Sequence, residues 1–343
     1  MQKNFDHFVP VLTIEKWEDF DNLFKGCGAV VFRGQGDCTW DLSTNYERTF
    51  GMNASRESSM LYRCIAEGHL FVEHPPENDD YVSWLAEMQH YEASTRLLDV
   101  SRSKYIALFM ALMGMKDGKR ESDGAVWAFD TVRADKALYN DLKERMPYIE
   151  VDGIDGSILG EGIMPYQDNG WKIANTAIGC EPAGKITLID KSLEGCKDLL
   201  GKYYGLGMVV HVVPRRTNRR LVAQQGEFLF PFNIKRTFVQ NLLGPIGGGD
   251  YGGDLCEFGD VGKRNQARAT VAPNVIKVVV PYSLRAEFID RLIEMNITYQ
   301  TLFPDEMGFM KSLQYQKDRR REGLRLVNNK ENGLTMLCNE FLL

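Results

Sequence analysis

Polar side chains of several catalytic types stand close together in one stretch of the chain. A Gln-His-Tyr triplet occupies 89–91, and a Thr-Arg-Leu-Leu-Asp run occupies 95–99. The following segment, 103–114, is apolar on every side, which predicts a helix buried in the core. Polar groups that lead into a buried helix must find partners there or remain unsatisfied, at roughly 1–3 kcal/mol each. The stretch is therefore either a structural hydrogen-bonding hub or the wall of a site.

A second candidate is an arginine that follows a predicted strand. A short β-branched run indicates a buried strand that ends at Arg33. A guanidinium fixed there can bind a phosphate or a carboxylate through two parallel hydrogen bonds. The alternative is a structural ion pair with Asp99 or Glu227. Gly34 and Gln35 keep the surroundings open and polar, which favours the binding interpretation.

Together these segments resemble the FRG domain, a bacterial family named for its Phe-Arg-Gly motif. The resemblance covers most of the chain, and several separate motifs occur in the expected order. They are Phe32-Arg33-Gly34-Gln35, Trp40-Asp41-Leu42, Gln89-His90-Tyr91, Thr95-Arg96-Leu97-Leu98-Asp99, Gln225-Gly226-Glu227-Phe228 and Leu302-Phe303-Pro304-Asp305. Proteins of this family are generally regarded as toxins or phage-defence effectors, so the resemblance implies such a role.

The strand followed by Arg and Gly is also similar to the first motif of the Arg-Ser-Glu type of ADP-ribosyltransferase. In that class the arginine holds NAD, and a late glutamate catalyses the transfer two residues after a Gln or Glu at a strand start. Gln225 and Glu227 have that spacing, and strand alternation puts them on one side. The resemblance implies that the negative charge of Glu227 stabilises the ribosyl cation. The segment 94–96, however, is expected to lead into a helix rather than form the Ser-Thr-Ser strand of that class.

The remaining polar residues have two interpretations each. His90, with an ordinary pKa of about 6.5, is either a general base or ribose-orienting group, or a half-buried histidine bonded to backbone. Tyr91 either stacks on a base or packs, and Arg96 is expected to form an internal salt bridge with Asp99. The predicted site lies where Arg33, His90, Arg96, Asp99 and Glu227 converge. The predicted catalytic residues are Glu227 and His90, and the predicted NAD-binding residues are Arg33, Gly34, Gln35, Tyr91, Thr95, Arg96 and Gln225.

Four arginines follow a predicted strand later in the chain, at 215, 216, 219 and 220. Such a cluster either binds the phosphates of a nucleotide or RNA, or belongs to a solvated loop. Arg220 is the member expected to point inward, because it lies closest to the turn at Gln225.

Composition narrows the class of protein. Hydrophobic residues make up 44% of the 343 residues, enough for a sizeable core, and the net charge of −6 disfavours nonspecific coating of nucleic acid. The seven cysteines form no CxxC pair, so no metal site is predicted. The start of the chain does not read as a signal peptide, and no apolar run reaches the ~18 residues that span a bilayer. We therefore expect a cytoplasmic protein without membrane contact.

The periodicity predicts a single α+β domain over 1–343, with a central mixed β-sheet flanked by helices; an ADP-ribosyltransferase-like core is compatible with it. A subfamily insertion or lid is expected at 146–206, and a mobile, acidic, Gly-rich loop at 244–263. Helices are expected at 13–25, 56–72, 79–91, 103–114 and from 283, and strands at 28–32, 124–130, 208–213 and 275–280.

Three functions follow from these patterns. The first is an NAD-using enzyme similar to ADP-ribosyltransferases, with a protein or RNA target. The second is a non-enzymatic module that senses a nucleotide or nucleic acid. The third is a structural interaction protein whose polar hub only stabilises the fold. The sequence predicts a nucleotide ligand and does not determine the oligomeric state.

Overall fold

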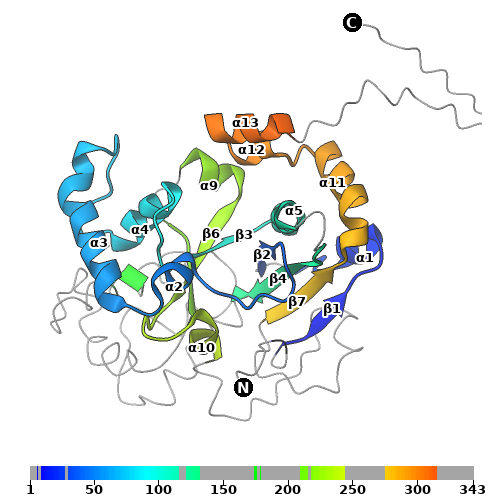
Figure 1. The fold of residues 1–343 in the computed structure, drawn as a ribbon, viewed down its shortest axis with the longest axis horizontal. Helices are drawn as coiled ribbons and strands as arrows, with labels where there is room; N and C mark the ends of the chain where they lie inside the picture. Colours follow the sequence, from blue (N-terminus) through cyan, green and yellow to red (C-terminus); the bar gives the residue numbers. More distant parts are fainter. Residues whose placement is uncertain are drawn as a thin grey trace, which may run out of the picture.

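The computed structural model describes residue 6 and residues 9–27, 30–115, 121–131, 174–175, 178, 209–214, 218–243 and 275–314. These residues form one seven-stranded sheet in the order β1-β7-β4-β2-β3-β6-β5 (Figure 1). β1 and β7 are parallel and every other pair is antiparallel, so the predicted α+β class with a mixed sheet is confirmed. The strands are β1 (Val11–Thr13), β2 (Val30–Gln35), β3 (Leu98–Ser101), β4 (Gly124–Asp130), β5 (Val209–Val212), β6 (Gly226–Pro231) and β7 (Val275–Val280).

Helices cover the sheet unequally. In Figure 1, α5 lies against the central strands, α1 and α11 cover the β1–β7 end, and α3 and α4 stand beside the β6 end. The helical segments are α1 (Trp17–Asn22), α2 (Asn45–Phe50), α3 (Ala54–Glu67), η2 (Gly68–Leu70), α4 (Tyr81–His90), α5 (Lys104–Gly114), α9 (Arg219–Ala223), α10 (Phe238–Leu243), η6 (Tyr282–Leu284), α11 (Arg285–Glu294), α12 (Tyr299–Leu302) and α13 (Glu306–Gln314).

The buried helix α5 is the centre of the fold, as its all-round apolar sequence predicts. It begins after Ser103, whose hydroxyl accepts a hydrogen bond from the Ile106 amide at 3.4 Å. The helix packs directly on β2, where a Cβ atom on Gly34 would lie 1.9 Å from the Ala107 carbonyl oxygen. Only a residue without a side chain allows this approach of strand and helix.

Several predicted boundaries are wrong. The segment predicted as a helix over 13–25 begins as β1, which pairs with β7, and the helix starts only at Trp17. The helix predicted over 56–72 ends at Glu67, where a 3₁₀ turn follows. The strand predicted over 28–32 continues through Arg33 to Gln35, because it pairs with β4 along its whole length.

One strand was not predicted. Leu98–Ser101 forms β3, which pairs with β6 from Leu98 opposite Leu229 to Ser101 opposite Gly226. The predicted insertion at 146–206, apart from three residues, and the Gly-rich loop at 244–263 lie outside the described residues, as do Arg215 and Arg216. Within the part of the chain that the structure describes, no helix has the length and apolar character that crossing a membrane requires.

Candidate functional site

A cavity of about 1420 Å³ opens between β2, β3, α4, α9 and the segment after α12. We call it the cleft. Arg33, the arginine of the Phe-Arg-Gly motif, lines it together with Asp99 of β3 and Gln89 of α4. His90 and Tyr91, at the end of α4, also line it. The cleft therefore joins the two stretches that the sequence singled out.

The sheet opens beside Arg33. β2 and β3 pair at a single register position, Phe32 opposite Ser101. Beyond it, the Arg33 side chain takes the place of a backbone donor, because its Nη1 donates to the Asp99 carbonyl at 2.8 Å. The same Nη1 lies 3.9 Å from Asp99 Oδ2. The arginine is thus fixed by backbone while its charge faces a carboxylate.

Arg33 is mostly buried, with 19% of its side chain exposed. Burial lowers the pKa of its guanidinium; the Asp99 carboxylate opposes this shift, and the positive charge of nearby Arg48 adds to it. Among the described residues its Nε is the one buried side-chain polar atom without a hydrogen bond. An anion between Arg33 and Arg48 would relieve the repulsion between their positive charges.

Asp99 is held from α4. Gln89 Nε2 donates to Asp99 Oδ1 at 2.5 Å, and the Thr95 hydroxyl donates to Gln89 Oε1. The Asp99 side chain is 62% exposed, whereas Thr95 is fully buried and does not line the cleft. Thr95 therefore reaches the site through Gln89 rather than by contact with a ligand.

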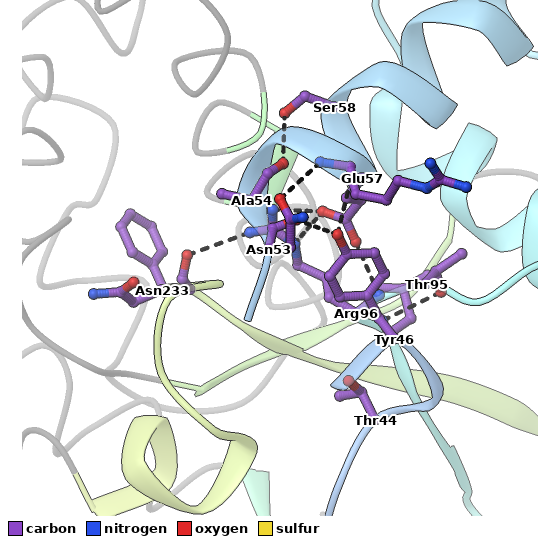
Figure 2. A network of polar contacts seen from close by, with 12 residues as sticks. Thr44, Tyr46, Asn53, Ala54, Glu57, Ser58, Thr95, Arg96 and Asn233 are labelled. Carbon is purple, nitrogen blue, oxygen red and sulfur yellow. Dashed lines mark hydrogen bonds and ion pairs between the residues drawn. The ribbon is translucent and has the colours of Figure 1, made fainter. Parts of the chain in front are cut away.

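Arg96 is the centre of a structural network rather than a member of the cleft. Its Nε donates to Glu57 Oε2 at 2.5 Å, and its backbone amide donates to Glu57 Oε1 at 3.0 Å. Figure 2 shows how this pair joins α3 to the segment before β3, with Tyr46 and Asn53 beside it. Both charged side chains are 1% exposed. The predicted Arg96–Asp99 salt bridge is wrong, because Glu57 is the partner.

Glu227 does not line the cleft. It lies in β6 opposite Val100, is 5% exposed, and accepts from His211 Nε2 at 2.7 Å. Its other oxygen lies 3.5 Å from Arg102 Nε. Phe228, the next residue along β6, is the one that lines the cleft. The catalytic role predicted for Glu227 stays a prediction, and the structure brings it together with neither Arg33 nor His90.

The other predicted ligand residues have local roles. Gln35 is buried, accepts from Trp127 Nε1 at 2.6 Å and donates to the Asp41 carbonyl at 3.3 Å. Gly34 lines the cleft and accommodates α5. Gln225 precedes β6 with a left-handed φ of 47° and does not line the cleft, so it does not share a strand face with Glu227.

The ends of the cleft carry aromatic and charged groups. The His90 and Tyr91 rings contact edge to face at 4.9 Å, and Tyr91 is 68% exposed. On the opposite side Arg220 lies 4.7 Å over the Phe303 ring, and both residues line the cleft. Charges of both signs line the cleft within the described part of the chain: Arg33, Arg48, Arg219 and Arg220 against Glu73, Glu87, Glu92, Asp99 and Asp305.

Sequence reasoning gave no role to several lining residues, among them Gln224, Ser101 and Asn45. Gln224 Nε2 donates to the Leu302 carbonyl at 3.0 Å and ties α9 to α12. Ser101 donates to the Gln224 carbonyl at 2.7 Å, and Asn45 lies in α2. Only the Leu302-Phe303-Pro304-Asp305 motif signalled that this late segment closes the cleft.

Comparison with family models decides the family of the motif-bearing segment. Residues 28–120 match the model described as FRG domain. This segment is an FRG domain. No curated protein and no solved structure matches the chain. The match confirms the resemblance and contains the first four motifs, whereas the motifs at 225–228 and 302–305 lie beyond it.

The FRG domain contributes Arg33, Gln89 and Asp99 to the lining of the cleft. The chain after it supplies the opposite side through α9 and Phe303. Within the described residues, no group of three or more His, Cys, Asp or Glu side chains could hold a metal ion.

Proposed function

We propose that the cleft binds NAD and that the protein is an NAD-using enzyme similar to ADP-ribosyltransferases. The observation that carries the proposal is the neighbouring placement of Arg33 and Asp99, 3.9 Å apart at the surface of one cleft. A guanidinium that lines the cleft suits the diphosphate, and a carboxylate beside it suits the ribose at which positive charge develops.

The charge pattern of the cleft supports NAD over a polyanion. Five carboxylates and four arginines of the described residues line it. NAD carries a cationic nicotinamide ring as well as two phosphates, so both signs find partners. A nucleic-acid strand presents only phosphates and would meet the carboxylates unfavourably. The volume also exceeds the ~300–1,000 Å³ typical of small-ligand pockets, which leaves room for a dinucleotide and an acceptor.

In the proposed reaction the bond between ribose C1′ and the nicotinamide nitrogen breaks. Nicotinamide leaves neutral with the bonding electron pair, and an acceptor oxygen or nitrogen forms the new bond to C1′ and loses its proton. Asp99 would stabilise the positive charge at C1′, while Arg33 and Arg48 hold the diphosphate. His90 lines the same cleft and is the group placed to receive the acceptor proton.

The test is incubation of the full chain with labelled NAD, alone and with cell lysate or RNA. Arg33→Gln and Asp99→Asn should lose nicotinamide release and label transfer by at least about tenfold while remaining folded. Arg63→Gln is the matched control, since Arg63 is 78% exposed on α3 and does not line the cleft. Glu227→Gln decides between the two carboxylates. Absence of both NAD binding and NAD turnover would remove the proposal.

A non-enzymatic nucleotide-sensing module is the second candidate function. It is favoured because Glu227 does not line the cleft and because four arginines of the described residues do. It predicts nucleotide binding that Arg33→Gln abolishes and Glu227→Gln leaves intact, with no nicotinamide released. A steep salt dependence of binding would point to nucleic acid. A toxin or phage-defence role, as the FRG resemblance implies, would be tested by expression toxicity and phage plating with the same variants.

A further inference from the structure

A directed chain of hydrogen bonds ends on Asp99. The Leu97 backbone amide donates to Thr95 Oγ1 at 3.3 Å, which leaves the hydroxyl proton to point elsewhere. That proton is donated to Gln89 Oε1, and Gln89 Nε2 donates to Asp99 Oδ1 at 2.5 Å. An amide can turn over and exchange its oxygen and nitrogen, but the Asp99 carboxylate only accepts, so the Gln89 NH₂ group must face it and Oε1 must face the Thr95 hydroxyl. Asp99 therefore always receives a donor from the protein.

The chain is anchored at its buried end. Thr95 is fully buried, and its carbonyl accepts from the Tyr46 amide at 3.1 Å. The next residue, Arg96, is fixed by the buried Glu57 carboxylate. The Thr95 hydroxyl therefore has little freedom to move, and its hydrogen bond fixes the Gln89 side chain, which in turn orients Asp99 in the cleft.

At the exposed end of this chain of hydrogen bonds, the Asp99 carboxylate can accept further hydrogen bonds. Asp99 Oδ1 takes the Gln89 amide, whereas Oδ2 lies 3.9 Å from Arg33 Nη1 and accepts no hydrogen bond from the described residues. A carboxylate has about four lone-pair sites. The side chain is 62% exposed and lines the cleft, so these open acceptor positions are accessible to a ligand that carries hydrogen-bond donors.

We infer that Asp99 binds the hydroxyl groups of a ribose whose 5′-phosphate lies on Arg33 and Arg48, so that the cleft selects ribonucleotides over deoxyribonucleotides. In a nucleotide, the ribose hydroxyls are hydrogen-bond donors that lie next to a phosphate. In the cleft, the Asp99 acceptor lies next to the arginine cations in the same way. Carboxylates bind ribose hydroxyls in dinucleotide sites for the same reason. Gln89 and Thr95 are positioning residues that act through Asp99. The inference rests on the proposed nucleotide site but not on cleavage of NAD.

The experiment measures binding of AMP, 2′-deoxy-AMP and 3′-deoxy-AMP to the full chain by calorimetry. AMP should bind at least about tenfold more tightly than one of the deoxy forms, because a hydrogen bond to a charged group is lost. Asp99→Asn should remove most of this discrimination. Equal affinity for the three nucleotides, or no AMP binding at millimolar concentration, would overturn the inference.

The positioning role has its own controls. Thr95→Val removes the hydroxyl at constant shape and should weaken the discrimination, and Thr95→Ser should restore it. Gln89→Leu breaks the chain at a second, half-buried position, so a failure of the Thr95 variant to fold leaves the test intact. Full discrimination in folded Gln89→Leu would remove the positioning role. Discrimination between AMP and deoxy-AMP without nicotinamide release would contradict only the proposed enzyme activity. Cleavage of NAD together with equal binding of AMP and deoxy-AMP would contradict only the inference about ribose.

Discussion

Replacement of Gly34 by alanine should destabilise the protein through a clash with backbone atoms. The new Cβ would lie 1.9 Å from the Ala107 carbonyl oxygen and 2.6 Å from the Ala111 amide nitrogen. Real Cβ atoms essentially never approach other atoms closer than 3.0 Å, so α5 must retreat from β2 by about 1.1 Å. Neither contact involves a flexible side chain that could rotate away.

The size of the effect follows from what α5 buries. Ile106, Leu108 and Leu112 are all at most 4% exposed. A radial gap of ~0.5–1 Å already forfeits a quarter to a half of each dispersion contact. Overpacking costs about 1–3 kcal/mol, and rigid backbone places this site at the upper end. Alanine recovers roughly 0.5–1 kcal/mol by restricting the unfolded chain. The expected net loss in free energy of unfolding is about 2 kcal/mol or more.

Urea unfolding monitored by circular dichroism measures this loss. Gly26→Ala is the control, because Gly26 has a φ of +80° and open space around it, so its cost of about 1–2 kcal/mol comes from conformation alone. Adding Ala107→Gly to Gly34→Ala should not rescue stability, since the contacted atom is a carbonyl oxygen. A loss below about 0.5 kcal/mol, or rescue by the double variant, would refute the steric explanation of the Phe-Arg-Gly glycine.

Two further predictions concern the polar pairs. Glu57→Gln should lower the free energy of unfolding by about 3–5 kcal/mol, because it leaves the Arg96 charge buried without its partner; urea unfolding checks this, and a loss under about 1 kcal/mol would contradict it. Burial and the hydrogen bond to Asp21 raise the pKa of Tyr105 to about 12. The folded state holds this proton more tightly than the unfolded state, so its stabilisation is complete below pH 10 and is lost as the pH rises from about 10 to 12. Tyr105→Phe should therefore lose less stability than wild type in that interval of a pH-dependent melting series, and equal slopes would count against the assignment.

The fold could be predicted where periodicity alone determines an element. α5, β4 and β7 are long or strongly apolar, and the structure has each within a residue or two of its predicted bounds. β3 could not be predicted in this way. It is four residues long, and its exposed Asp99 interrupts an apolar pattern that directly precedes a helix. Its existence depends on pairing with β6, a strand far away in the sequence.

The candidate site, like the fold, could be predicted only where the local sequence pattern is sufficient. The sequence located Arg33 and the Gln-His-Tyr triplet, because polar groups beside buried segments are conspicuous. It could not assign partners. Glu57 reads as a surface residue of a helix, yet it is the buried partner of Arg96. Two-residue spacing placed Gln225 beside Glu227, but the strand begins only at Gly226, and the left-handed φ of Gln225 turns that residue out of the strand.

The cleft exists because the sheet is incomplete where these residues lie. A longer β2–β3 ladder would engage the Asp99 carbonyl with a backbone amide and leave no role there for a side chain. With one register pair, Arg33 supplies the donor itself and is thereby fixed next to the Asp99 carboxylate. The Gly34 contact with α5 keeps β2 in place despite the short ladder. The Phe-Arg-Gly motif thus places the packing glycine next to the arginine that we propose as a binding group, and this explains why the two are adjacent in the sequence.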